Sequence, residues 1–278
     1  MRPLRNAYLD ALGIDRWVPR NAPPEESGAA QGLPGFESAA TEPVLQAKTS
    51  APVAPAESAK HANPRPALLQ PAPLQPSNWT PLPPTADWGE LRERVAGCMA
   101  CELCKTRTQT VFGVGDQRAE WLVIGEAPGA EEDRQGEPFV GRAGQLLNAM
   151  LMAIGLPRET VFIANILKCR PPANRDPKPE EVSKCLPYLT NQIALLKPKM
   201  ILVVGRIAAQ NLLATDAPLA RLRGKLHHFG EANTPLVITY HPAYLLRTPS
   251  DKRKAWEDLK FARATYARLA GGNTPGNG

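Results

Sequence analysis

Four short apolar runs, separated by stretches with helical periodicity, constrain the fold of this chain more than any other feature. The runs span residues 121–124, 161–167, 200–204 and 236–240, and none alternates between apolar and polar residues as a half-exposed strand does. Helical patterns occupy residues 87–96, 143–154, 179–196, 207–213 and 251–269. Solidly apolar strands that alternate with helices are typical of a mostly parallel sheet covered on both faces. The sequence therefore predicts an α/β fold, a three-layer α/β/α sandwich with a central four-stranded, mostly parallel sheet.

The compact domain is expected to span residues 87–270, because the preceding stretch has a different composition. Of the 30 prolines in the chain, 14 lie between Asn21 and Ala86. A segment rich in Pro, Ala, Gln and Ser with few aromatic residues cannot bury enough surface to offset the entropy cost of ordering it. We therefore expect a disordered linker at residues 21–86 and a disordered tail at residues 271–278.

Residues 1–20 form a short amphipathic segment in which Leu4, Tyr8 and Leu12 recur every four residues. Two interpretations stay open for this segment. It either docks a partner protein, or it packs on the main domain or is only partly ordered.

Charge is distributed unevenly along the chain. Residues 1–90 carry 7 Lys/Arg and 9 Asp/Glu, a net charge of −2, whereas residues 91–278 carry 26 and 18, a net charge of +8. A basic domain favours a polyanionic partner, although ordinary solubilising charge explains the excess equally well. No run of 18 apolar residues is present, and the N-terminus lacks the apolar stretch of a secretory signal. We therefore expect a cytoplasmic, monomeric protein.

Polar and special residues follow each predicted strand at its carboxyl end. GEAPG at residues 125–129 follows the first strand, Asn165 lies near the end of the second, Gly205 and Arg206 follow the third, and HPAYLLR at residues 241–247 follows the fourth. Ligands of open parallel sheets bind outside the carboxyl ends of the strands. These residues are therefore expected to gather in one site.

Five cysteines stand in a pattern typical of a thiolate metal site. Cys98, Cys101 and Cys104 form CMACELC, while Cys169 and Cys185 lie far downstream and sixteen residues apart. In a reducing compartment, metal ligation or inert burial is more common than disulfide formation. The widely split second pair favours an iron–sulfur cluster over zinc. Spacing alone does not tell which of the first three cysteines is spare, and some of the five could be buried thiols.

Five segments, taken in order, resemble the family 4 uracil-DNA glycosylases, the iron–sulfur type. They are the CxxC motif followed by RTQTVFGVGD, then GEAPGAEEDRQGEPFVGRAGQLL, NILKCRPPANRDP, RLRGK and HPAYLLR, and they extend from about Cys98 to Arg247. The resemblance implies a glycosylase-like fold that hydrolyses the N-glycosidic bond between uracil and deoxyribose in DNA and initiates base excision repair. A related family that becomes trapped covalently on uracil carries GEQPG and an inserted basic loop, and this chain has neither.

The resemblance also implies a set of site residues. It places a 4Fe–4S cluster on Cys98, Cys101, Cys169 and Cys185, which leaves Cys104 as an additional thiol. It places Phe139 against the uracil ring and Asn165 at its polar edge, with Gly125 and Ala127 beside the base. The implied catalytic residues are Glu126, Glu132 and His241.

The chemistry of the reaction explains why these residue types are needed. A flipped pyrimidine is stabilised by an aromatic face, and one amide can both accept from and donate to the N3–H and O4 edge of uracil. As the bond to the sugar breaks, negative charge gathers on uracil O2, where His241 can donate, and a carboxylate can orient the attacking water. The sequence does not tell whether Glu126 or Glu132 orients it.

Four further residues are candidates for contacts with DNA. Arg142 is expected to bind phosphate, and Leu245 to enter the stack that the flipped base leaves, with Tyr244 and Arg247 beside it. The alternative function is a non-catalytic iron–sulfur or zinc protein that binds nucleic acid or senses redox state. Such a protein has no need for Phe139, Asn165 and His241 together.

Overall fold

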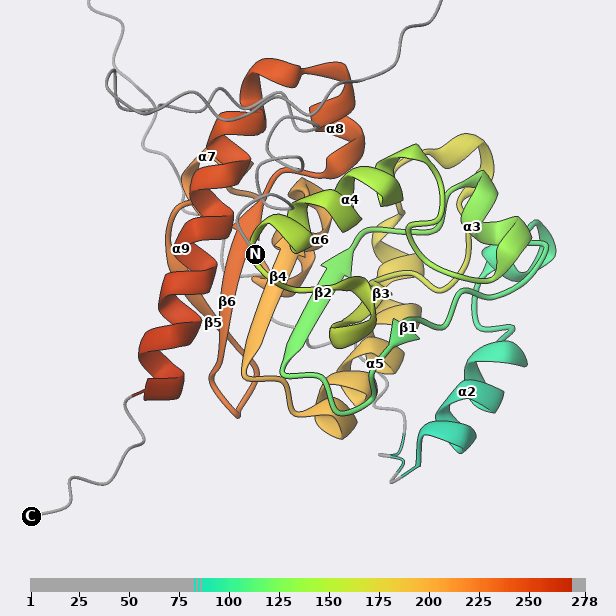
Figure 1. Cartoon of the computed structure of the whole chain (residues 1–278). Coiled ribbons are helices and arrows are strands. Elements are labelled where there is room, and N and C mark those ends of the chain that lie inside the picture. Colours follow the sequence, from blue (N-terminus) through green and yellow to red (C-terminus); the bar gives the residue numbers. More distant parts are fainter. Residues whose placement is uncertain (1–82, 84, 86, 272–278) are drawn as a thin grey trace, which may run out of the picture. The chain divides into compact units, whose positions relative to one another are not determined.

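The computed structural model describes residues 83, 85 and 87–271 and folds them around one mixed sheet of six strands (Figure 1). The strand order is β1-β3-β2-β4-β6-β5. The strands are β1 (Val114–Gly115), β2 (Trp121–Gly125), β3 (Phe162–Asn165), β4 (Met200–Val204), β5 (Leu226–Phe229) and β6 (Thr234–Thr239). The expectations for residues 1–20, for the linker and for the tail concern residues outside the described part, apart from residues 83 and 85 of the linker and Gly271, which ends the last helix.

The four predicted strands form the parallel centre of the sheet. β2 pairs with β3 and β4, and β4 pairs with β6, all in parallel. Every residue of β2, β3 and β4 is buried, which explains why these strands read as unbroken apolar runs. A mostly parallel α/β sheet is therefore confirmed.

The predicted number of four strands is wrong, because β1 and β5 add one antiparallel strand at each edge. β1 has only two residues, and β5 alternates between exposed and partly buried side chains, so neither forms an apolar run. The glycines beside β1 are explained by close packing. A Cβ on Gly115 would lie 1.9 Å from the Val161 carbonyl oxygen, and Gly115 has a φ of +121°.

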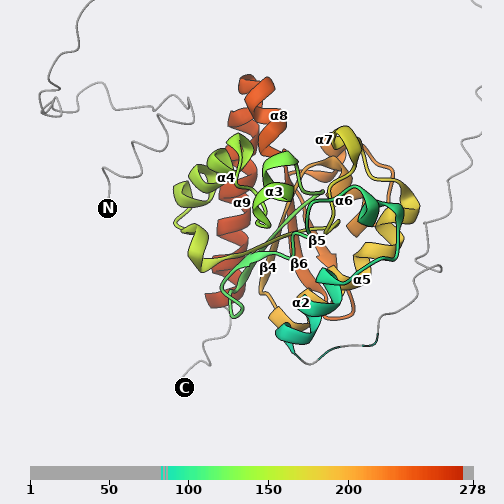
Figure 2. The ribbon, with the colours of Figure 1, turned by 90° about the vertical axis from the view of Figure 1, so that its right-hand side faces the viewer.

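Helices cover both faces of the sheet, as the edge-on view shows (Figure 2). One face packs against α2 (Trp88–Ala96), α5 (Pro179–Leu196), α6 (Arg206–Leu212) and α7 (Leu219–Leu222). The other packs against α4 (Arg142–Ala153), α8 (Pro242–Arg247) and α9 (Lys252–Gly271). Alternate residues of β2 point to opposite faces, with Leu122 and Ile124 in the first core and Trp121 and Val123 in the second.

The five predicted helices correspond to α2, α4, α5, α6 and α9, each within two residues of its expected ends. Asp87 caps the first of these, because its side chain accepts from the Glu90 amide. Three short helices were not expected: α3 (Ala130–Gln135), α7 and α8. The HPAYLLR motif is therefore a strand end followed by a helix, with His241 as its N-cap.

The tight edge at Gly115 generates a test of the fold. Gly115→Ala combines a positive φ with a steric clash against main chain, so we expect a loss of about 3 kcal/mol in the free energy of unfolding. Gly155→Ala is the matched control, because Gly155 also has a positive φ (+78°) but no atom within 4 Å of the added Cβ. The control should lose about 1 kcal/mol. Denaturant unfolding of both variants measures the difference, and equal losses would show that the β1–β3 edge does not pack as described.

Candidate active site

A cleft of about 400 Å³ opens at the carboxyl ends of the parallel strands. Most of the expected site residues line it: Glu126, Ala127, Glu132, Phe139, Asn165, His241, Tyr244 and Arg247. A volume of this order accommodates a nucleobase with part of its sugar. The structure thus brings together side chains from four segments that are far apart in the sequence.

Asn165, the last residue of β3, contributes a buried amide to the cleft. Its side chain is 2% exposed, and its Oδ1 atom has no hydrogen-bond partner among the described residues. An unpaired buried acceptor typically costs about 1–3 kcal/mol, so native structures rarely leave one without a purpose. The Oδ1 atom of Asn165 is therefore available to accept a hydrogen bond from a molecule that enters the cleft.

Gly125, Phe139 and Asn165 meet at the base of the cleft. A Cβ atom on Gly125 would lie 2.4 Å from Asn165 Oδ1 and 2.6 Å from Phe139 Cζ, so only glycine allows both side chains to occupy this space. Gly125 does not itself line the cleft; it makes room for the two residues that do. This close approach is the structural reason for glycine at the end of β2.

Phe139 is held in a strained main-chain conformation, with a φ of +55°. Arg158 stabilises it by donating to the carbonyl oxygens of Pro138 (2.6 Å) and Phe139 (3.3 Å). Gly144 permits the same geometry from the other side, because a Cβ there would lie 1.8 Å from Phe139 O. Sequence reasoning missed Arg158, which lies nineteen residues downstream of Phe139 with no motif around it.

Glu132 organises the loop that carries Phe139. Its Oε1 accepts from the amides of Val140 (3.0 Å) and Gly141 (3.2 Å), and its Oε2 accepts from the amide of Gly129 (3.1 Å). Three main-chain donors occupy the carboxylate and join the two ends of the loop. The second glutamate of the acidic run is thus a main-chain clamp in this structure.

His241 presents an imidazole to the cleft in a defined tautomer. The amide of Ala243 donates to its Nδ1 (3.1 Å), so the neutral ring carries its proton on Nε2. Burial, with a smaller effect of nearby Arg247, lowers the pKa of His241 to about 4. The ring lies near Phe139, with 5.7 Å between ring centroids. At neutral pH the cleft therefore contains a neutral Nε2–H donor beside an aromatic ring.

Glu126 is the carboxylate with the most perturbed protonation in the cleft. Burial, reinforced by the negative charge of Asp176 and opposed by Arg206, raises the pKa of Glu126 to about 7. Arg206 itself pairs with Asp176 at 3.0 Å. Glu126 can therefore exchange a proton near neutral pH, unlike an ordinary surface glutamate.

One wall of the cleft comes from the segment between Cys169 and Cys185, which sequence reasoning did not assign to the site. Its contributions are Pro171, Asn174, Arg175 and Asp176. Asn174 has a φ of +53°, and Arg175 pairs with buried Glu181 through two contacts of 2.6 and 2.9 Å. Nothing in the sequence of the CRPPANRDP motif showed that this segment forms a wall of the cleft.

The rim beyond His241 carries a stack of aromatic rings. Tyr244 lies parallel to Tyr240, with 5.2 Å between centroids, and the Arg223 guanidinium lies 5.0 Å from the Tyr240 centroid. Tyr244 also donates to Asp251 at 2.6 Å, which fixes its ring at the mouth of the cleft. The predicted role of Tyr244 at the rim thus has a rigid support.

The expected insertion of Leu245 into DNA is wrong for this structure. Leu245 is 1% exposed and packs in the core beneath α4 and α9, so it cannot reach a base stack. The helical turn of α8 sends the neighbouring Leu246 outward instead, with 37% of its surface exposed. Arg142 is exposed at the start of α4 and does not line the cleft.

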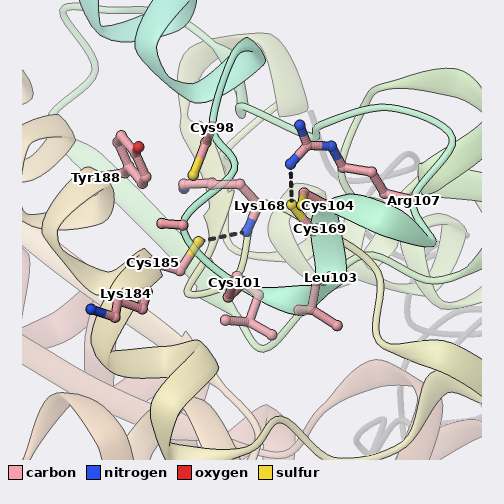
Figure 3. A pocket seen from close by; sticks show the side chains of 12 residues that line it. Cys98, Cys101, Leu103, Cys104, Arg107, Lys168, Cys169, Lys184, Cys185 and Tyr188 are labelled. Atoms are coloured by element: carbon pink, nitrogen blue, oxygen red, sulfur yellow. Dashed lines mark hydrogen bonds between the residues drawn. The ribbon is translucent and has the colours of Figure 1, made fainter.

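The five cysteines surround a second, smaller pocket (Figure 3). Arg107 donates to Cys169 Sγ at 3.0 Å, and the main-chain amide of Lys168 donates to Cys185 Sγ at 3.1 Å. Burial raises the pKa of Cys185 to about 12, so this thiol needs a cation to become a thiolate. Cys104 lines the same pocket as the four cysteines assigned to the cluster.

Comparison with known proteins assigns the family. A model of the uracil DNA glycosylase superfamily matches residues 112–260. A type-4 uracil-DNA glycosylase from Archaeoglobus fulgidus is 44% identical over 177 residues, which cover 62% of this chain and 89% of the relative. The type-4 uracil-DNA glycosylases of Pyrobaculum aerophilum and Thermotoga maritima are 43% and 40% identical to this chain. Each match covers 62% of this chain and 91% of the relative. The chain belongs to the type-4 uracil-DNA glycosylase family.

The chain is accordingly a uracil-DNA glycosylase, a hydrolase of N-glycosyl bonds, and the non-catalytic alternative is not supported. A type-5 uracil-DNA glycosylase from Pyrobaculum aerophilum is more distant, at 31% identity over 150 residues that cover 47% of this chain and 64% of the relative. None of the described helices of the glycosylase is long and apolar enough to cross a lipid bilayer.

The tautomer and charge of His241 can be tested directly in the glycosylase. Because its pKa is lowered to about 4, we expect the ring to stay neutral above about pH 5 with Nδ1 unprotonated. Nitrogen chemical shifts of labelled histidine, recorded between pH 5 and pH 8 and assigned with His241→Asn, report both properties. A protonation midpoint near the ordinary histidine value would contradict the burial described here.

Proposed function

We propose that the glycosylase extrudes uracil from DNA into the cleft and hydrolyses its bond to the sugar through Phe139, Asn165 and His241. The observation that carries this proposal is the unpaired, buried Oδ1 of Asn165, which lies beside Phe139 in the cleft that His241 also lines. A base inside a duplex is inaccessible to such a cleft, so the nucleotide has to be flipped out.

Asn165 is proposed to read the edge that distinguishes uracil from cytosine. Its Oδ1 accepts from uracil N3–H, and its amide nitrogen donates to O4. Cytosine offers an acceptor and a donor at these positions, in the opposite order, so both groups of the amide would be left mispaired. A site built on such buried hydrogen bonds can reject the wrong ligand by roughly 10⁴-fold or more.

His241 is proposed to stabilise the leaving uracil. Its side chain lines the cleft, and because Nδ1 already accepts from the Ala243 amide, Nε2–H is the donor that the ring can offer to a ligand. As the N-glycosidic bond breaks, the electron pair goes to the base and its charge develops on O2, where this donor strengthens its hydrogen bond. Preoriented donors of this kind typically contribute about 10²- to 10³-fold in rate.

Glu126 is proposed as the carboxylate that orients water toward the cationic sugar. Glu132 is less suited to this role, because three main-chain amides already occupy its oxygens. Glu126 lines the cleft and has a pKa of about 7, so its deprotonated form is available at and above neutral pH to accept a proton from water. Glu132 then serves as a positioning residue for the Phe139 loop.

Contacts with the DNA strand are proposed for the rim of the cleft. Arg247 lines the cleft, and Arg142 is exposed at the start of α4, so both are candidates for phosphate binding. The stacked Tyr240 and Tyr244 rings offer an aromatic surface beside the extruded nucleotide. We propose that Leu246, the exposed neighbour of Leu245, inserts into the base stack that the flipped nucleotide leaves.

A 4Fe–4S cluster is proposed on Cys98, Cys101, Cys169 and Cys185. All four line one pocket, and thiolates are the donors that iron–sulfur clusters require. Bound there, the cluster would supply a cross-link rather than a reaction step. The segment between Cys169 and Cys185 forms a cleft wall, so the cluster would hold that wall in place.

The proposed reading of uracil is tested by Asn165→Asp. A carboxylate accepts but cannot donate, so we expect kcat/KM on a uracil-containing oligonucleotide to fall at least about 100-fold. Asn211→Asp is the matched control, since it makes the same charge change on α6, outside the cleft lining, and should retain near wild-type activity. Strand breakage after alkali treatment measures both. Wild-type activity and selectivity in Asn165→Asp would remove the assigned role.

The proposed role of Glu126 predicts a pH dependence. Since its raised pKa is about 7, the water-orienting carboxylate form is lost as pH falls through 7, and kcat should rise with pH across that range. Glu126→Gln should slow turnover and flatten this limb. Glu131→Gln, the same change at an exposed glutamate of α3, should keep it. Retention of the limb in Glu126→Gln would assign the titration to another group.

A further inference from the structure

Lys168 is a fully buried lysine that the proposed reaction does not use. Its side chain is 1% exposed, and it lies in sequence between Asn165 of the uracil cleft and Cys169 of the cysteine pocket. Buried lysines are rare unless they are paired, because removing an ammonium from water is costly. The contacts of Lys168 therefore indicate why an ammonium is buried at this position.

The hydrogen bonds of Lys168 connect the two sites. Its Nζ donates to the main-chain carbonyl of Asn165 at 2.8 Å and to Gln192 Oε1 at 2.7 Å. Gln192, which is also fully buried, donates in turn to Phe112 O at 2.9 Å. The ammonium thus holds the main chain of Asn165, the residue proposed to read uracil, and Gln192 anchors it to the segment that follows the CxxC motif.

The other side of Lys168 faces the cysteines. Its main-chain amide donates to Cys185 Sγ, and its side chain lines the cysteine pocket (Figure 3). Among the described residues, no carboxylate forms an ion pair with the Lys168 ammonium, whose hydrogen bonds go to Asn165 and Gln192. The two hydrogen-bond acceptors of Nζ are neutral, so the positive charge is without a countercharge until the thiolates are formed.

We propose that Lys168 is a positioning residue that couples the cysteine site to the uracil cleft: its charge balances the anionic cluster, and its hydrogen bond sets the position of Asn165. A 4Fe–4S cluster with four thiolate ligands carries a net negative charge, which a buried ammonium stabilises strongly at low local dielectric. The inference rests on the proposed roles of Asn165 and of the cluster. It explains why a costly charge is buried between them.

The test compares Lys168→Met, which removes both charge and donor, with Lys168→Gln, which removes the charge but keeps an N–H donor. Lys184→Met is the matched control, because Lys184 also adjoins a cysteine and lines the same pocket but is exposed to solvent. The full chains are purified anaerobically. Iron content, the reduction potential of the cluster and the inhibition constant of free uracil are then measured for each.

We expect the potential to move to more negative values in both Lys168 variants and to stay at the wild-type value in Lys184→Met, because a lost positive charge disfavours the more negative reduced cluster. The inhibition constant of uracil should rise about tenfold in Lys168→Met, less in Lys168→Gln, and less than about twofold in the control. Affinity for an oligonucleotide with an abasic site should be unchanged in all three. If Lys168 had only a structural role, its replacement would lower the iron content, and the reduction potential would not shift in protein that retains its iron.

Potentials of the Lys168 variants equal to that of Lys184→Met, or an unchanged inhibition constant in Lys168→Met, would overturn the coupling. If neither neutral variant binds iron, Lys168→Arg tests the role of the charge. Iron binding by this positively charged variant supports that role, and absence of iron counts against it. A wild-type chain that carries no iron, or that does not bind free uracil, refutes the proposed function instead, so the two failures are distinguishable.

Discussion

The segment from Asn165 to Cys169 serves two sites within five residues, and much of the remaining structure follows from that constraint. Asn165 ends β3 with its amide in the uracil cleft, while Cys169 faces the cysteine pocket. The main chain between them continues the sheet as a loop, with the amides of Ile166 and Leu167 donating to Gly125 and Glu126. Neither site can move independently of the other, because both are attached to the same short length of chain.

Buried polar groups around this segment are paired with one instructive exception. Lys168 and Gln192 satisfy each other and two main-chain carbonyls, and Glu132 satisfies three amides of the Phe139 loop. Asn165 Oδ1 alone among these groups has no partner in the described chain. An unsatisfied buried acceptor destabilises the free protein, and a substrate bound in the cleft could pair with this atom. Stability and recognition are therefore opposed at this atom.

The electrostatics of the cleft follow from burial more than from net charge. Burial lowers the pKa of His241 and raises that of Glu126, so the donor proposed for the leaving base and the acceptor proposed for water are both available near neutral pH. The excess of basic residues in the domain acts at longer range, where it favours association with a polyanion. In the proposed function, specificity for uracil depends on the few hydrogen-bonding groups at the base of the cleft.

Local sequence determined the central strands, the long helices and the side of the sheet on which the site lies, because apolar runs and helical periodicity are properties of adjacent residues. Motif order also indicated Phe139, Asn165 and His241. Only the tertiary structure decided which groups meet: that Arg158 supports Phe139, that the loop after Cys169 forms a cleft wall, and that Leu245 is buried while Leu246 is exposed. The sequence pattern did not predict the edge strands β1 and β5. β1 has two residues and β5 belongs to a polar hairpin, so each is stabilised by pairing with a neighbouring strand rather than by burial of its own side chains. These features depend on contacts between residues that are distant along the chain, and no local pattern records them.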